Sequence, residues 1–79
     1  MITRNILKCR EFVALDGSIL REILNADKDG LGFRYSLAHA CVLPGRKTRP
    51  HSLKTSEVYY ILQGSGIMHI GDESQAVGP

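Results

Sequence analysis

Residues 11–24, EFVALDGSILREIL, decide the fold that this sequence predicts. Two apolar runs, 11–15 and 18–24, flank the dipeptide formed by Asp16 and Gly17. Glycine accepts the positive φ angle that a tight turn requires, so Asp-Gly between apolar runs is a strong hairpin signal. The letters ILREIL alone are also compatible with one or two helical turns. Because no helical period persists over a longer window, we expect two antiparallel strands here.

The rest of the chain repeats this pattern of short apolar runs between turns marked by glycine or proline. Alternate residues of the longest run, 33–43, place six mostly apolar side chains on one face. Residues 25–32, NADKDGLG, have the composition of a loop. Further strands are expected at residues 2–8, 49–53, 57–64, 66–71 and 74–78. Seven or eight short strands (about the number in a small sandwich) predict an all-β sandwich or barrel.

The composition is that of one small globular domain, with 79 residues, of which 43% are hydrophobic and 23% charged. A net charge of +2 with scattered basic residues argues against nucleic-acid binding, which requires a concentrated basic surface. No apolar run reaches the roughly 18 residues of a membrane span, and the first residues lack the layout of a signal peptide. Cys9 and Cys41 form no CxxC pair. We therefore expect a cytoplasmic protein with free thiols, a single disulfide being the alternative.

A defined spacing of five positions runs through residues 45–64, GRKTRPHSLKTSEVYYILQG. The five positions are Gly45, His51, Leu53, Glu57 and Gly64. This pattern resembles the first conserved motif of the cupin superfamily, in which a glycine, two histidines, a glutamate and a glycine hold these places. Four of the five positions match, and Leu53 stands where the family has its second histidine. The resemblance covers residues 33–79, whose flanking runs also look like a small single-domain cupin.

This resemblance implies a jelly-roll barrel or β-sandwich, formed by a single domain over residues 1–79 with its motif region at 45–64. The second motif of the family, which supplies a further histidine, has no counterpart, because the chain stops at AVGP. We therefore expect the barrel to be incomplete, with the chain truncated at its C-terminal end before that second motif.

The resemblance also implies a metal site, with His51 and Glu57 as ligands of a divalent transition metal such as Fe, Mn, Zn or Ni. His69 is a further candidate ligand if its strand turns it inward, and a solvent-facing residue otherwise. Without the resemblance, the carboxylate of Glu57 is equally compatible with an ion pair to Arg49, a proton held by a raised pKa, or a solvated position near Lys54.

Arg49, Tyr35 and Tyr59 are candidates for binding a small polar or anionic ligand in the barrel. A solvated loop and ordinary core packing are the alternatives for these three side chains. Two functions follow: a metal-dependent enzyme with dioxygenase-like or sugar-isomerase-like chemistry, or a non-catalytic binding or sensory module whose metal site has eroded. Leu53 favours the second function, whereas the presence of both His51 and Glu57 favours the first.

The run VYYIL, residues 58–62, is apolar on both faces. A strand with one solvated face would alternate, so this run is expected to be covered on both sides. In so small a chain the second cover is expected to come from another subunit, and free strand edges favour the same outcome. We therefore expect a homodimer, with residues 2–8 or the 33–43 strand at the contact, as in small cupins that pair through sheets or exchanged strands.

Overall fold

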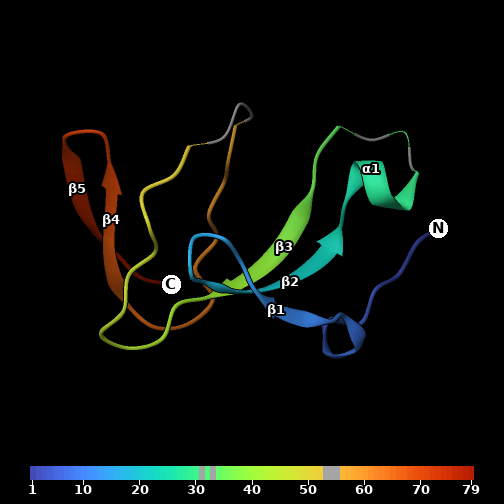
Figure 1. The fold of residues 1–79 in the computed structure, drawn as a ribbon, viewed down its shortest axis with the longest axis horizontal. Helices are drawn as coiled ribbons and strands as arrows, with labels where there is room; N and C mark the ends of the chain where they lie inside the picture. Colours follow the sequence, from blue (N-terminus) through green and yellow to red (C-terminus); the bar gives the residue numbers. More distant parts are fainter. Residues whose placement is uncertain (31, 33, 53–55) are drawn as a thin grey trace.

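The computed structural model describes residues 1–30, 32, 34–52 and 56–79. Most of the regular structure in these residues consists of strands in two antiparallel sheets, and helix is confined to single turns. Figure 1 shows the larger sheet on the right, a two-stranded hairpin on the left, and irregular segments joining the two. The chain is therefore all-β, as the sequence predicts.

The larger sheet contains three strands in the order β1-β2-β3. Their bounds are Glu11–Val13 for β1, Ile19–Leu24 for β2 and Leu37–Cys41 for β3. Both pairings are antiparallel, and the register between β2 and β3 shifts between Glu22 and Leu24. The strands predicted at 11–15, 18–24 and 33–43 are confirmed, each shorter than predicted, and β3 the most so because it pairs only along the length of β2.

The turn between β1 and β2 confirms the hairpin predicted from Asp16 and Gly17. The amide of Ala14 donates to the carbonyl of Ser18 at 2.8 Å. The Ser18 amide and hydroxyl both donate to Oδ1 of Asp16, at 2.9 and 2.6 Å. Gly17 has a φ of +91°, a conformation in which a side chain would be strained. Asp16 therefore acts as the hydrogen-bond acceptor that closes the turn.

The second sheet is an antiparallel hairpin of β4 (Gly66–Ile70) and β5 (Glu73–Val77). Ile67 lies opposite Ala76, and His69 lies opposite Ser74. The strands predicted at 66–71 and 74–78 are confirmed within a residue at each end. Figure 1 shows this hairpin separated from the larger sheet, with the C-terminus returning between them.

Two single-turn helices differ from the predictions. Residues 2–8 were expected to form a strand, but Ile6–Lys8 form the 3-10 turn η1, because the side chain of Asn5 accepts a hydrogen bond from the Leu7 amide at 3.0 Å. Within the predicted loop 25–32, Ala26–Asp29 form the helical turn α1, capped in the same way by Asn25. In both places the side chain of an asparagine accepts hydrogen bonds from backbone amides of the turn that follows it. The pattern of apolar residues does not reveal such an N-cap.

The strands predicted at 49–53 and 57–64 are not found in the described parts of these ranges, 49–52 and 57–64. No backbone hydrogen bond joins residues 57–62 to another described residue. A strand requires a pairing neighbour, and an apolar run without one stays an isolated segment. For the same reason the described strands form two separate sheets and do not close the expected barrel.

The described residues contain no buried hydrophobic side chain, and Ser18, at 3% exposed, is their one buried residue. The expected double cover of VYYIL is absent within a single chain, since Val58 is 95% exposed and Tyr60 85%. Half-buried side chains on both sides of β2 provide the main internal packing. Within the same part of the chain, no helix is long and apolar enough to cross a membrane.

Candidate functional site

The segment that carries His51 lies against the β1–β2 turn. The backbone amide of Arg49 donates to the carbonyl of Asp16 at 2.8 Å, which fixes this segment against the turn. The ring nitrogen Nδ1 of His51 lies 3.0 Å from the carbonyl oxygen of Arg49 and 3.8 Å from Oδ2 of Asp16. The imidazole is thus held between its own backbone and a carboxylate contributed from 35 residues earlier in the chain.

Asp16 is the carboxylate at the centre of this arrangement, with a side chain only 19% exposed. The hydroxyl and the amide of Ser18 hold the pKa of Asp16 below its ordinary value, and the charge of His51 contributes in the same direction. Partial burial opposes them without reversing the shift. Asp16 therefore remains ionised over the neutral range and attracts a protonated His51.

Glu57 and Tyr59 form a second pair of candidate residues. The hydroxyl of Tyr59 donates to Oε1 of Glu57 at 3.3 Å. Burial raises the pKa of Tyr59, and the charge and hydrogen bond of Glu57 raise it further. The charge of Asp16 adds to this effect. Glu57 and Tyr59 thus form a hydrogen-bonded pair of near neighbours in sequence.

The described contacts join His51 to Asp16 and Tyr59 to Glu57, and no hydrogen bond or ion pair among the described residues joins these two pairs to each other. Asp16 was interpreted from the sequence only as a turn residue, so its place beside His51 was missed. No local pattern reveals it, because the contact joins segments far apart in the chain. Leu53 and Lys54, named in the sequence predictions, lie outside the described residues.

The fit of a metal ion rests first on His51. A histidine that binds a metal through one ring nitrogen usually donates its other N–H to a carbonyl or carboxylate. The contact of Nδ1 with the Arg49 carbonyl has this form and leaves Nε2 available. The described residues, however, hold no group of three or more His, Cys, Asp or Glu side chains suited to a metal ion. His51 thus fits as a ligand, and the donor set around it is incomplete.

The remaining candidates lie elsewhere. His69 is on β4, where its Nδ1 lies 2.8 Å from the hydroxyl of Ser74 across the hairpin. Arg49 is exposed and joins the site through its backbone, while Tyr35 is exposed just before β3. The contacts of the described residues therefore bring His51 together with Asp16 and Glu57 together with Tyr59, and they place His69 on the separate β4–β5 hairpin.

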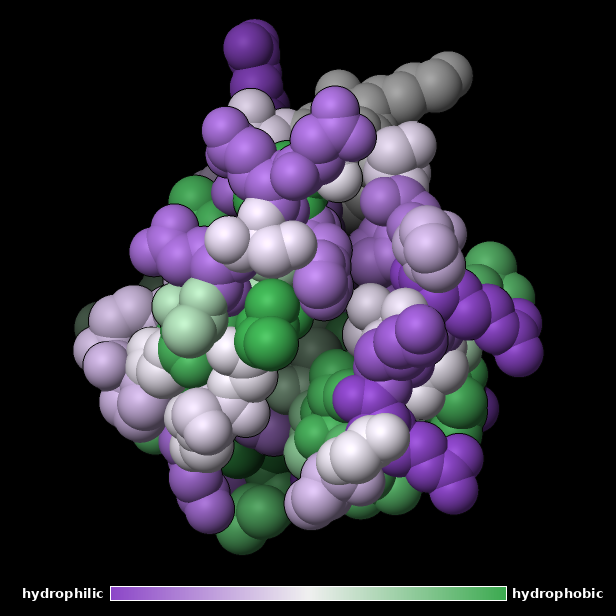
Figure 2. Space-filling model, turned by 90° about the vertical axis from the view of Figure 1, so that its left-hand side faces the viewer, coloured by the Kyte–Doolittle hydropathy of each residue, from purple (hydrophilic) through white to green (hydrophobic). Residues whose placement is uncertain are grey.

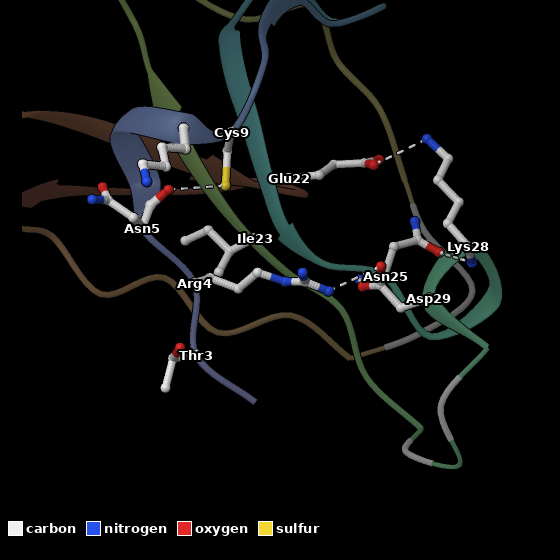
Figure 3. Close-up of a pocket in the computed structure, with 10 residues that line it drawn as sticks. Thr3, Arg4, Asn5, Cys9, Glu22, Ile23, Asn25, Lys28 and Asp29 are labelled. Atoms are coloured by element: carbon white, nitrogen blue, oxygen red, sulfur yellow. Dashed lines mark hydrogen bonds and ion pairs between the residues drawn. The ribbon is translucent and has the colours of Figure 1, made fainter. Parts of the chain in front are cut away.

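A hollow of about 360 Å³ lies between the N-terminal segment, β2 and α1 (Figure 3). Its wall carries two ion pairs, from Arg4 to Asp29 at 3.1 Å and from Lys28 to Glu22 at 3.0 Å. These four charges neutralise one another, whereas Lys8 adds a further positive charge to the same wall. The site beside the β1–β2 turn is the better candidate, because it holds the histidine that the motif spacing singles out.

Comparison with known proteins identifies a relative from an archaeon. The chain is 42% identical, over 79 aligned residues, to a protein of Methanocaldococcus jannaschii described as Uncharacterized protein MJ1618. The match covers 92% of this chain and 62% of that protein, so the chain spans less than two thirds of the relative's length. No protein-family profile matches the chain. No solved structure matches it either.

Proposed function

We propose that this chain is a cupin-type protein that binds a small polar or anionic molecule beside the β1–β2 turn. The arrangement of His51 between the Arg49 carbonyl and the Asp16 carboxylate carries this proposal. The motif spacing from Gly45 to Gly64 supports a cupin-like jelly roll, which an incomplete barrel of two sheets would approximate.

The chemistry of the site suits a ligand with both donors and acceptors. His51 presents Nε2, Tyr59 presents a hydroxyl, and Arg49, whose carbonyl holds the imidazole, carries an exposed positive charge two positions away in the sequence. An anionic group would interact with the guanidinium, because Arg offers several donors to one carboxylate or phosphate. Glu57 and Asp16 would accept hydrogen bonds from the hydroxyl or amino groups of the same molecule.

Binding is tested by thermal unfolding in the presence of small dicarboxylates, phosphate and hydroxy acids. A ligand at 100 times its Kd stabilises the native state by about 2.7 kcal/mol, and this raises the midpoint temperature of unfolding measurably. His51→Ala should abolish the shift, whereas His69→Ala, which removes an imidazole from the separate β4–β5 hairpin, should retain it. Equal shifts in wild type and His51→Ala, or no shift with any probe, would contradict the proposal.

A metal-dependent enzyme is the second candidate, favoured by the contact that leaves Nε2 of His51 available. His51 and Glu57 would hold a divalent Fe, Mn, Zn or Ni ion, with Asp16 orienting the imidazole through its carboxylate. Such an ion would supply Lewis-acid or oxygen chemistry to a bound metabolite, of the oxygenase or isomerase kind. Leu53, in place of a second histidine, favours the alternative of a non-catalytic sensory module.

Metal content separates these two candidates. If the metal candidate holds, purified wild-type protein retains close to one equivalent of transition metal, and His51→Ala retains far less, as measured by plasma mass spectrometry. Glu57→Gln, which keeps the side chain's size and removes its charge, should also lose metal. Wild-type protein that stays metal-free after incubation with all four ions would leave only the binding module.

A further inference from the structure

Asp16 and Gly17, which form the β1–β2 turn, are also a pair of residues that can rearrange covalently. In any Asp-Gly pair the amide nitrogen of the glycine can attack the side-chain carboxyl carbon of the aspartate, because no side chain on the glycine hinders the approach. The five-membered succinimide ring that results opens to aspartate or to isoaspartate. The sequence holds a second such pair, Asp29 and Gly30, so the structure can be asked how it treats each of them.

The closed turn engages both reacting groups of the first pair. The Gly17 amide donates to the carbonyl of Ala14 at 3.0 Å. Oδ1 of Asp16 accepts the amide and the hydroxyl of Ser18, at 2.9 and 2.6 Å. Attack requires the amide nitrogen to leave its acceptor and the carboxyl carbon Cγ to rotate onto it. A Cβ at Gly17 would meet nothing within 4 Å, so hydrogen bonds, and not crowding, hold the two groups apart.

We propose that Asp16–Gly17 is a covalent modification site that the closed β1–β2 turn protects. When the turn opens, Asp16 isomerises to isoaspartate, and the segment that carries His51 is released from the turn. The reaction needs only these two residues and water, so the proposal is independent of the ligand proposed for His51.

The reaction balances without any further reagent. The nitrogen of Gly17 forms a bond to Cγ of Asp16, and one carboxyl oxygen leaves as water with the amide proton and one proton from solvent. Water then opens the ring, and a proton returns to solvent. Opening at Cγ restores aspartate, whereas opening at the main-chain carbonyl carbon of Asp16 gives isoaspartate. The product therefore has the mass of the original chain.

Isomerisation exchanges the two groups of Asp16 that hold residues 49–51. In the closed turn the main-chain carbonyl of Asp16 accepts the Arg49 amide at 2.8 Å, and Oδ2 lies 3.8 Å from Nδ1 of His51. In isoaspartate the former main-chain carbonyl carbon carries the free carboxylate, and the former side-chain carboxyl becomes part of the backbone. Since the backbone also gains one methylene group, neither contact can persist in its present geometry.

The second pair provides an internal reference. Asp29 ends α1, a single helical turn, and both Asp29 and Gly30 are exposed. The carboxylate of Asp29 has partners too, Arg4 at 3.1 Å and the amide of Asn25 at 3.0 Å. An isolated helical turn is marginal in water, so these contacts open more readily than a hairpin turn between paired strands. In folded protein Asp29 should therefore isomerise before Asp16.

Ageing of the purified protein at neutral pH, folded and in urea, tests the proposal. Isoaspartate is located by mass spectrometry after digestion with a protease that cleaves before aspartate and not before isoaspartate. In urea both pairs should react at similar rates. In folded protein the modified turn arises only from the open fraction. Isoaspartate at position 16 should then form about tenfold more slowly than in urea, equivalent to an opening cost of about 1.4 kcal/mol. Equal rates at position 16 in the two conditions, or faster reaction there than at Asp29 in folded protein, would overturn the proposal.

Two serine variants show whether the turn itself gives the protection. Ser18→Ala removes one hydrogen bond to Asp16 and should speed isomerisation at position 16 about fivefold in folded protein, with no change of rate in urea. Ser74→Ala removes a hydroxyl that lies 2.8 Å from His69 on the β4–β5 hairpin, on the side of the molecule that Figure 2 shows. Its rate at position 16 should equal that of wild type. Equal rates for both variants would contradict protection by the turn.

Hydrogen exchange on wild-type protein makes the test independent of how Ser18→Ala folds. As urea is added below the unfolding transition, exchange of the Gly17 amide and isomerisation of Asp16 should accelerate together, because both require the open turn. Protein isomerised at position 16, separated from unmodified protein, should show rapid exchange of the Arg49 amide. Acceleration of exchange without isomerisation, or slow Arg49 exchange in the isomerised protein, would refute the proposed coupling.

Discussion

At the scale of single residues, Asp16 has two tasks. Its Oδ1 accepts both hydrogen bonds of Ser18, and its Oδ2 faces His51. The same carboxylate therefore closes the hairpin turn and orients the candidate site. A residue that is ordinary in a turn becomes functional through a contact from elsewhere in the chain.

The lowered pKa of Asp16 gives a pH dependence of stability. Because the folded-state pKa lies below the ordinary 3.8, ionised Asp16 stabilises the folded state above pH 3.8, and this contribution disappears as the pH falls through the folded-state pKa. Asp16→Asn keeps an acceptor oxygen and loses the charge, so it should cost about 1 kcal/mol near pH 6. The difference in the free energy of unfolding between wild type and Asp16→Asn should shrink towards zero in strong acid. Urea unfolding of wild type and Asp16→Asn, measured from pH 6 down to strong acid, tests this prediction. It is wrong if the two proteins lose stability in parallel as the pH falls.

At the scale of elements, the β1–β2 turn depends on the backbone conformation of Gly17. Its φ is +91°, and a Cβ placed there would touch nothing within 4 Å, so the cost of Gly17→Ala is purely conformational. We expect about 1–2 kcal/mol of destabilisation. Gly66→Ala is the matched control, since its surroundings are equally open and its φ is not positive; it should be neutral or slightly stabilising. Equal thermal midpoints for the two variants would contradict the observed turn.

The same elements show how far sequence reasoning reaches. The β1–β2 and β4–β5 hairpins were predictable, because pairing between neighbours in sequence is encoded in their turns and apolar runs. Residues 57–62 have the same apolar character, but a strand also needs a partner, which no local pattern supplies. The site divides in the same way. The motif spacing singles out His51 and Glu57, whereas the contact of His51 with Asp16 arises only from tertiary structure.

At the scale of the whole molecule, the central claim is that segments remote in sequence converge on the β1–β2 turn. Two observations support it: the Arg49 amide donates to the Asp16 carbonyl, and the His51 imidazole lies beside the Asp16 carboxylate.

Nuclear Overhauser effects in solution test this convergence most directly. The account predicts cross-peaks from the Arg49 amide to the Asp16–Gly17 backbone, and from the His51 ring to the side chain of Asp16. The Arg49 amide should also exchange slowly with solvent, because it donates a 2.8 Å hydrogen bond. Cross-peaks confined to the individual hairpins, together with rapid exchange at Arg49, would contradict the account.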